Sequence, residues 1–151
     1  MDATKLLTEQ HEEVKQLFKE CESLGESEFK RRSDIVQQIT QKLRLHTQIE
    51  EEILYPGVKS VDPDMVLESF EEHHMVKILL EEIEQTPASN ERYMAKLTVL
   101  QEMVEHHIEE EEGTLFPELM KECGAQKLND FGIKLQERFK ELQKGVASPR
   151  Q

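Results

Sequence analysis

Residues 46–56 read HTQIEEEILYP and residues 107–117 read HIEEEEGTLFP, so one pattern occurs twice at a distance of 61 residues. Each copy has a histidine, a glutamate four residues later, and then a leucine, an aromatic residue and a proline. Residues 11–18 (HEEVKQLF) and 73–80 (HHMVKILL) match in the same way at a distance of 62 residues. The chain therefore contains two copies of one unit, in which a helix with a single histidine is followed by a helix with His-x-x-x-Glu.

The spacing of apolar residues by three and four predicts the helices of this unit. Helices are expected over about 3–24, 27–54, from 63 to the turn at 87–90, and 90–112. Residues that break helices are expected to end them: Gly25, Pro56 with Gly57, Pro87 with Asn90, and Gly113. Asp62 is a plausible N-cap for the third helix, and Pro63 suits its first position.

Short connections between amphipathic helices predict an all-α fold, an antiparallel up-down-up-down four-helix bundle spanning residues 1–122. A further helix is predicted over about 127–144, and with its tail it makes up a C-terminal segment, 123–151. The apolar face of this helix consists of Phe131, Leu135, Phe139 and Leu142. It lies outside the duplicated unit, and it either covers a side or an end of the bundle or supplies a dimer interface. The sequence leaves open whether the protein is a monomer or a homodimer.

Composition narrows the classes of protein to consider. A chain of 151 residues with 36% hydrophobic and 34% charged residues suits one helical domain. The net charge of −13 argues against nucleic acid or an anionic membrane as partner. We expect a cytoplasmic location, because no apolar run is long enough to span a membrane and the N-terminus has no secretion pattern. Cys21 and Cys123 have no metal-ligand spacing and are expected to be free thiols.

Six polar residues fall on the apolar stripes of the predicted helices: His11, His46, Glu50, His73, His107 and Glu111. A buried imidazole needs a partner, and a buried carboxylate needs a neutralising charge. A single such histidine is usually an ordinary core residue, but six positions aligned by a duplication indicate a metal site. Residues four apart share a helix face, so each His-x-x-x-Glu can address one centre. The donor set suits iron, manganese or zinc, and two bridging glutamates would leave coordination positions open for small oxidants.

Three further pairs of residues lie beside these six: Glu51 and Glu112, His74 and His106, and Lys15 and Lys77. The two glutamates belong either to a solvated face or to the groups that orient a ligand. The two histidines point about 100° away from their neighbours and are expected at the surface. The two lysines are expected to extend outward, although either could meet an anion on the metal.

These motifs resemble the hemerythrin-like HHE cation-binding family over about residues 3–120. The resemblance implies a four-helix bundle around a non-haem di-iron centre bridged by two carboxylates and an oxo or hydroxo group. It assigns the four stripe histidines as terminal ligands and Glu50 and Glu111 as bridges. Oxygen-carrying hemerythrins have a fifth histidine where this chain has Lys77, and they have an aspartate five residues after the fourth-helix histidine, whereas Glu111 follows His107 by four. These differences favour the more varied HHE branch of the family over the oxygen-carrying hemerythrins.

Three hypotheses for function remain at this point. The first is a protein with two iron ions that binds O2 or reacts with peroxide or nitric oxide, either as a peroxide-consuming enzyme or as a binding protein. The second is an iron store, donor or sensor whose metal loading changes binding to a protein partner that the sequence does not identify. The third is a structural bundle that holds adventitious zinc. Manganese and zinc are the alternatives to iron.

Overall fold

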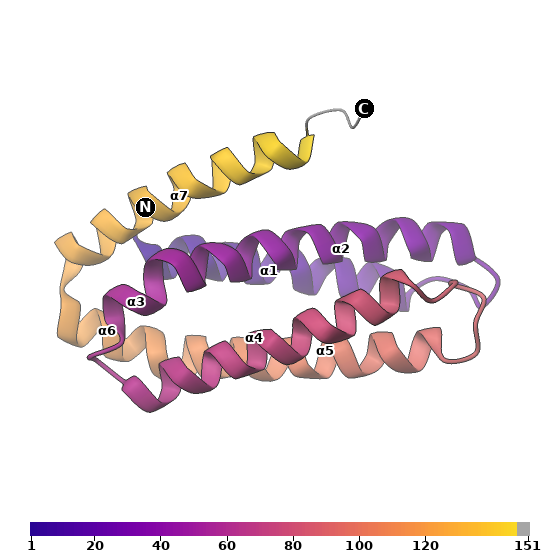
Figure 1. Cartoon of the computed structure of the whole chain (residues 1–151), viewed down its shortest axis with the longest axis horizontal. Coiled ribbons are helices and arrows are strands. Elements are labelled where there is room, and N and C mark those ends of the chain that lie inside the picture. The colour runs from indigo at the N-terminus through magenta and orange to yellow at the C-terminus, as the bar shows by residue number, and fades with distance from the viewer. Residues whose placement is uncertain (148–151) are drawn as a thin grey trace.

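The computed structural model describes residues 1–147, with side chains through residue 145, and this part of the chain contains helices and no strand. The elements are α1 (Ala3–Glu22), α2 (Phe29–Ile49), η1 (Glu50–Leu54), α3 (Tyr55–Val58), α4 (Pro63–Glu84), α5 (Tyr93–Glu110), η2 (Glu111–Leu115), α6 (Phe116–Cys123) and α7 (Ala125–Ala147) (Figure 1). The segments η1 and η2 are single π-helical turns. The all-α prediction is confirmed. No helix of the described part is long and apolar enough to cross a membrane.

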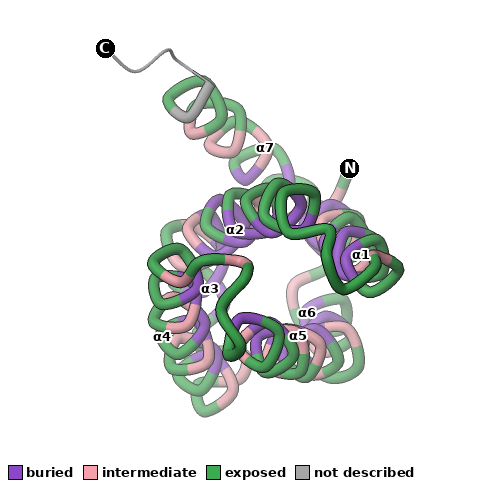
Figure 2. The backbone as a smooth tube through the Cα atoms, turned by 90° about the vertical axis from the view of Figure 1, so that its right-hand side faces the viewer, coloured by how far each residue is buried: buried purple, intermediate pink, exposed green. Residues whose placement is uncertain are grey.

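The long helices α1, α2, α4 and α5 lie alongside one another (Figure 1). Helix α1 packs on α2 and α4 packs on α5, and contacts of α2 with α4 and of α1 with α5 join the two pairs. The end-on view shows these helices around a common interior, with their buried residues facing it (Figure 2). Helix α7 packs against α1 and α2 on the outside.

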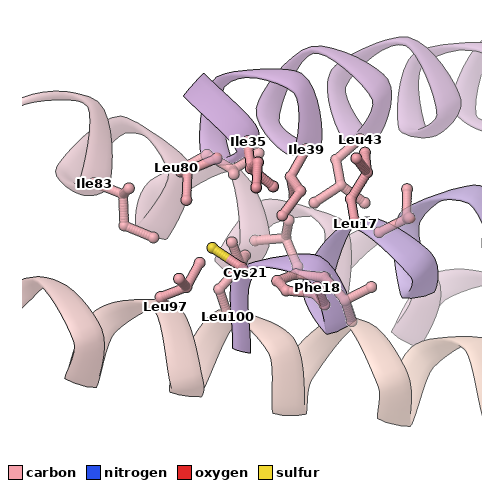
Figure 3. Close-up of a cluster of buried hydrophobic side chains, with 14 of the residues drawn as sticks. Leu17, Phe18, Cys21, Ile35, Ile39, Leu43, Leu80, Ile83, Leu97 and Leu100 are labelled. Atoms are coloured by element: carbon pink, nitrogen blue, oxygen red, sulfur yellow. The ribbon is translucent and has the colours of Figure 1, made fainter. Parts of the chain in front are cut away.

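The interior consists of two apolar clusters. The first is built mainly from α1, α2, α4 and α5 and contains Phe18, Ile39, Leu80 and Leu100 (Figure 3). The second contains residues of α1, the π-helical turns, α6 and α7. On α1, Leu7 belongs to the second cluster and Val14 to the first, and His11 lies between them. The four stripe histidines thus lie where the two clusters meet.

The predicted helix end at Gly113 is wrong, and the predicted end at Pro56–Gly57 comes one residue early. The helical backbone continues through η1 to Val58 and through η2 to Cys123. A proline inside an α-helix clashes with the carbonyl four residues earlier. In η1 the N–H of Tyr55 donates to the carbonyl of Glu50, five residues back, and this wider turn gives the Pro56 ring room. The second unit instead ends at Gly124, whose φ of 83° suits glycine.

Other helix boundaries agree with the sequence more closely. The Asp62 side chain accepts from the N–H of Met65, and Pro63 opens α4, as predicted. Helix α1 ends at Glu22, three residues before Gly25, and Ser23 caps it. Helix α7 is longer than predicted, since it covers Ala125–Ala147 and passes through Gly145, and the predicted tail beyond residue 147 lies outside the described residues.

Helix α7 closes one end and one side of the bundle. Its Leu128 and Leu135 are buried in the second apolar cluster. At Gly132 a Cβ would overlap the carbonyl oxygen of Met1, and at Gly57 it would overlap the ring of Phe131, so both glycines permit close approach. Of the roles left open for this helix, the structure therefore shows the covering role.

Candidate metal centre

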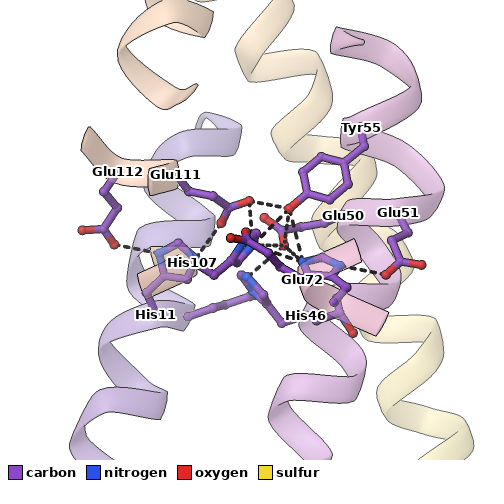
Figure 4. Close-up of polar contacts among 12 residues, drawn as sticks. His11, His46, Glu50, Glu51, Tyr55, Glu72, His107, Glu111 and Glu112 are labelled. Atoms are coloured by element: carbon purple, nitrogen blue, oxygen red, sulfur yellow. Dashed lines mark hydrogen bonds and ion pairs between the residues drawn. The ribbon is translucent and has the colours of Figure 1, made fainter. Parts of the chain in front are cut away.

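The structure brings the six stripe residues together, and all six are buried. They converge from α1, α2 with η1, α4, and α5 with η2 (Figure 4). The imidazoles of the four histidines each direct Nε2 toward one of the two carboxylates. The distances are 3.1 Å for His11 to Glu111, 3.3 Å for His46 to Glu50, 3.1 Å for His73 to Glu50 and 3.4 Å for His107 to Glu111.

These donors form two overlapping groups. In the first, donor atoms of His11, His46, Glu50 and Glu111 all lie within 4.8 Å of one another. In the second, donor atoms of Glu50, His73 and His107 lie within 4.8 Å. Glu50 belongs to both groups. Glu111 also spans them, because its Oε1 lies 3.1 Å from His11 and its Oε2 lies 3.4 Å from His107. The two carboxylates thus lie between two pairs of imidazoles.

The outer nitrogens of two histidines contact glutamates that the sequence left unassigned. The Nδ1 of His11 donates to Glu112 at 2.7 Å, and the Nδ1 of His73 donates to Glu51 at 2.7 Å. A carboxylate can only accept, so these contacts place the proton on Nδ1 and leave Nε2 free to face the interior. Lys77 contacts both oxygens of Glu51 at 3.0 Å, which holds that carboxylate in place. Glu51 and Glu112 therefore orient histidines of the cluster.

The other two histidines have outer partners that sequence reasoning missed. His46 donates from Nδ1 to the amide oxygen of Gln10 at 2.6 Å, and His107 donates to Glu72 at 2.6 Å. Gln10 and Glu72 occupy equivalent places in the repeat, each directly before a stripe histidine, which is the one sequence feature that could have identified them. The repeat is imperfect here, because one partner is a neutral amide and the other a carboxylate.

The remaining neighbours lie where the sequence placed them. His74 and His106 are exposed, as predicted. The Lys15 side chain pairs with Glu12 at 3.5 Å. In this structure neither that lysine nor Lys77 contacts any of the six stripe residues through an ion pair.

Tyr55 is a further polar residue at the cluster. Its hydroxyl contacts Glu111 Oε2 at 2.5 Å and Glu50 Oε1 at 3.1 Å. It also lies 3.2 Å from Nε2 of His73 and 3.3 Å from Nε2 of His107. Burial, together with the charges of Glu111 and Glu50, raises the pKa of Tyr55 well above its usual value, so the phenol carries its proton in this arrangement. By position, Tyr55 can reach a metal held by the second donor group.

The π-helical turn explains why the sequence did not reveal Tyr55. In an α-helix a residue five positions on is turned by about 140° from the first, so Tyr55 would leave the inner stripe of Glu50. The i to i+5 hydrogen bond of η1 instead stacks Tyr55 on Glu50. In the second copy η2 places Phe116 in the same way, and its ring stacks on His11 at 6.0 Å between centroids. The aromatic residue before each proline was the available indication.

Two buried polar atoms test whether a cation fits here. Nε2 of His46 and Oε2 of Glu50 are buried and make no hydrogen bond within the described part of the chain. Buried polar atoms are almost always paired in native proteins. Both residues belong to the first donor group, where a cation could contact them. The residues present therefore fit a metal, and the cluster is compatible with a metal centre.

The electrostatics of the cluster favour a positive charge. Burial opposes ionisation of Glu50, but the imidazoles of His46, His107 and His73 outweigh it and hold the pKa of Glu50 well below its usual value. Burial likewise opposes a charged His107, yet the carboxylates of Glu111 and Glu50 raise the pKa of His107 well above its usual value. Two ionised carboxylates in an apolar interior thus attract protons when no metal is bound.

A small cavity of about 20 Å³ lies beside the imidazoles. All four stripe histidines line it, together with Gln10, Val14, Leu43, Thr47, Val76, Val104 and Ile108. A space of this size holds one water-sized molecule. The arrangement therefore combines polar donors on one side with a mostly apolar space for a very small ligand on the other.

Comparisons with known proteins bear on the family and the fold. The profile of the family described as hemerythrin HHE cation binding domain matches residues 2–119. A DNA nickase from Nostoc sp. (strain PCC 7120) is 31% identical over 107 residues, which make up 70% of this chain and 30% of the nickase. The chain thus spans less than a third of that relative. The crystal structure of a hemerythrin HHE cation binding domain-containing protein from Mycobacterium kansasii has a TM-score of 0.83 at 22% identity, covering 99% of this chain and 95% of that one.

Proposed function

This chain belongs to the hemerythrin HHE cation-binding family, and we propose that it is a non-haem di-iron protein that binds O2 or reacts with peroxide or nitric oxide. The observation that carries the proposal is the pair of overlapping donor groups that share Glu50 and are spanned by Glu111. Two imidazoles per group with shared carboxylates suit two metals held side by side. We further propose that the surrounding helices form an antiparallel up-down-up-down bundle.

In this proposal His11 and His46 would hold one iron, and His73 and His107 would hold the other. Glu50 and Glu111 would serve both irons as bridging carboxylates, and the Tyr55 hydroxyl would lie next to the second iron. Imidazole and carboxylate donors also accept manganese and zinc, so iron is the element that the family resemblance favours. When bound, such a pair of irons supplies electrons and open coordination positions for a small oxidant.

The chain's own residues decide what can reach these positions. Val14, Leu43, Val76 and Val104 line the cavity of about 20 Å³, whose small size favours ligands of a few atoms over larger substrates. Their apolar side chains also keep bulk water from the imidazoles. The Tyr55 hydroxyl holds a proton between the two carboxylates, 2.5 Å from Glu111 and 3.1 Å from Glu50. The site is thus arranged for small, reactive ligands.

Nucleic acid and anionic membranes are not proposed as partners. The net charge of −13 would repel phosphate groups. The activity of the DNA nickase is not proposed here, since the match accounts for 30% of that protein. The free thiols of Cys21 and Cys123 fit a reducing cytoplasm, which is the location we propose.

Metal analysis of anaerobically prepared protein, followed by an absorption spectrum in air, tests the proposal. Two irons per chain and oxo-bridge bands in the near ultraviolet are expected. Steady-state consumption of peroxide would identify an enzyme, whereas a reversible spectral change without consumption would identify a binding protein. Fewer than two irons, or iron without the bridge bands, would refute the di-iron assignment.

One contact favours a second candidate, an iron or redox sensor. Glu52 lies in η1 with Glu50, and its Oε1 accepts from Arg138 Nε of α7 at 2.7 Å. The turn that carries a bridging carboxylate is therefore attached to the C-terminal helix. Hydrogen exchange of the α7 amides should then differ between metal-free and iron-loaded protein, and equal protection in the two states would rule this candidate out.

A further inference from the structure

His106 and Glu110 form another His-x-x-x-Glu pair, shifted by one residue from His107 and Glu111. Residues four apart on a helix share a face, and Nε2 of His106 lies 2.7 Å from Oε1 of Glu110. The pair faces away from the buried cluster, since the His106 side chain is 62% exposed. Helix α5 therefore presents one such pair inward and a second one outward.

Glu72 of α4 completes the outward pair as a three-residue group. Its Oε2 lies 3.7 Å from Nε2 of His106, and donor atoms of Glu72, His106 and Glu110 lie within 4.8 Å of one another. The other oxygen of Glu72, Oε1, accepts from Nδ1 of His107 at 2.6 Å. One carboxylate thus contacts both the surface group and a histidine of the buried centre. Figure 4 labels Glu72 and His107 of this arrangement.

The surface group carries negative charge that no basic side chain balances. Among the described residues, neither Glu72 nor Glu110 has a lysine or arginine within 4.0 Å, and their ion pairs run to histidines. Glu68, one turn before Glu72 on α4, adds a third carboxylate that acts on Glu110. A divalent cation would offset this charge and would meet one nitrogen and two oxygen donors.

The duplication gives an internal comparison. Residues equivalent to Glu72, His106 and Glu110 in the first half are Gln10, Leu45 and Ile49. Leu45 and Ile49 are buried and apolar. The equivalent positions in the first half therefore have neither an imidazole nor a carboxylate. The duplication alone does not explain why the second half has a donor group at its surface.

We propose that Glu72, His106 and Glu110 form a surface site for a divalent cation such as Fe²⁺, Mn²⁺ or Zn²⁺, and that this site supplies metal to the buried centre. Three protein donors leave positions for water, which suits rapid binding and release. Glu72 links the surface site to the buried centre, because its other carboxylate oxygen accepts from the outer nitrogen of His107. The supplying role rests on the proposed function, whereas binding at the surface does not.

Titration with Mn²⁺ under anaerobic conditions, followed by the electron paramagnetic resonance signal of the free ion, tests binding. The wild-type protein should bind a third, weaker equivalent beyond the two buried ones. His106→Ala should lose that equivalent and His74→Ala, which changes the other exposed histidine, should keep it. Glu110→Gln should likewise weaken it, whereas Glu109→Gln removes the same charge from the same helix outside the group and should not.

The outcomes separate this inference from the proposed function. A weak equivalent that depends on His106 in a protein without the two tight ones would refute the di-iron proposal and support the surface site. Absence of a third equivalent in the wild type, or its survival in His106→Ala, would overturn the surface site while leaving the buried centre in place.

The supplying role has its own measurement. Fe²⁺ uptake into the buried centre, followed anaerobically by stopped flow, should be slower in His106→Ala than in the wild type, because the surface site loses its nitrogen donor. The final iron content should stay at two per chain, and His74→Ala should load at the wild-type rate. An unchanged loading rate in His106→Ala would overturn the supplying role.

Discussion

Glu50→Gln should be one of the two most damaging conservative changes at the candidate metal centre. The Glu50 side chain is fully buried, and its Oε1 lies 3.3 Å from His46, 3.1 Å from His73 and 4.0 Å from His107. The substitution keeps the volume and removes the charge. Removing one partner of a buried charge pair costs about 3–5 kcal/mol. At about 1.4 kcal/mol per factor of ten, iron affinity should fall by about a hundred- to several-thousand-fold.

Competition with a chelator of known affinity under anaerobic conditions measures this loss. Glu111→Gln should behave like Glu50→Gln, because Glu111 also spans the two donor groups. Glu51→Gln is the matched control, since that residue only orients His73 and should cost about 10- to 100-fold. A larger loss in Glu51→Gln than in Glu50→Gln, or a Glu50→Gln affinity within tenfold of wild type, would refute the bridging scheme.

Three further predictions concern the ligands, pH and the C-terminal helix. His73→Ala should reduce iron to at most one per chain after equilibrium dialysis, whereas His74→Ala should retain two; the reverse result in metal analysis would place the α4 register off by one. The carboxylates of Glu111 and Glu50 raise the pKa of His107 well above its usual value of 6.5 in the metal-free protein, so protons compete with metal. The Zn²⁺ affinity should therefore be constant at high pH and begin to fall at a pH above 6.5; an affinity unchanged down to pH 6.5 would contradict this. Gly132→Ala should lower the free energy of unfolding by about 1–3 kcal/mol in chemical denaturation, because the added methyl group overlaps backbone, while Gly145→Ala, which has open space around it, should not destabilise the protein.

The straight α-helical parts of the site could be predicted from the sequence because the α-helical period is a local property. His11 and His73 lie inside regular helices, so the spacing of apolar residues by three and four was enough to place them on the inner face. The π-helical turns could not be predicted in this way. They depend on one extra residue per turn, and that residue changes which side chain follows Glu50 on the inner face.

Contacts between side chains of different helices also could not be predicted from the helical period. Gln10 stands beside His11 in the sequence but accepts from His46 of α2, and Glu72 stands beside His73 but accepts from His107 of α5. Each contact depends on how one helix is rotated about its axis relative to its neighbour. The sequence shows that Gln10 and Glu72 each precede a stripe histidine. It does not show which neighbouring helix carries the histidine that they contact.

The two halves of the duplicated unit differ at two kinds of position: the aromatic residue after each π-helical turn, and the residue that accepts from a histidine of a neighbouring helix. Phe116 replaces the phenol of Tyr55, and a neutral amide replaces the carboxylate of Glu72. A carboxylate partner makes an imidazole a stronger donor than an amide does, so under the proposed function we expect His107 to bind metal more strongly than His46 for the same geometry. The added negative charge, the Tyr55 hydroxyl and the surface group all fall on the side of His73 and His107, whereas α7 packs on α1 and α2. If the duplicated unit holds two metals, we therefore expect the position at His73 and His107 to attract a cation more strongly than the position at His11 and His46.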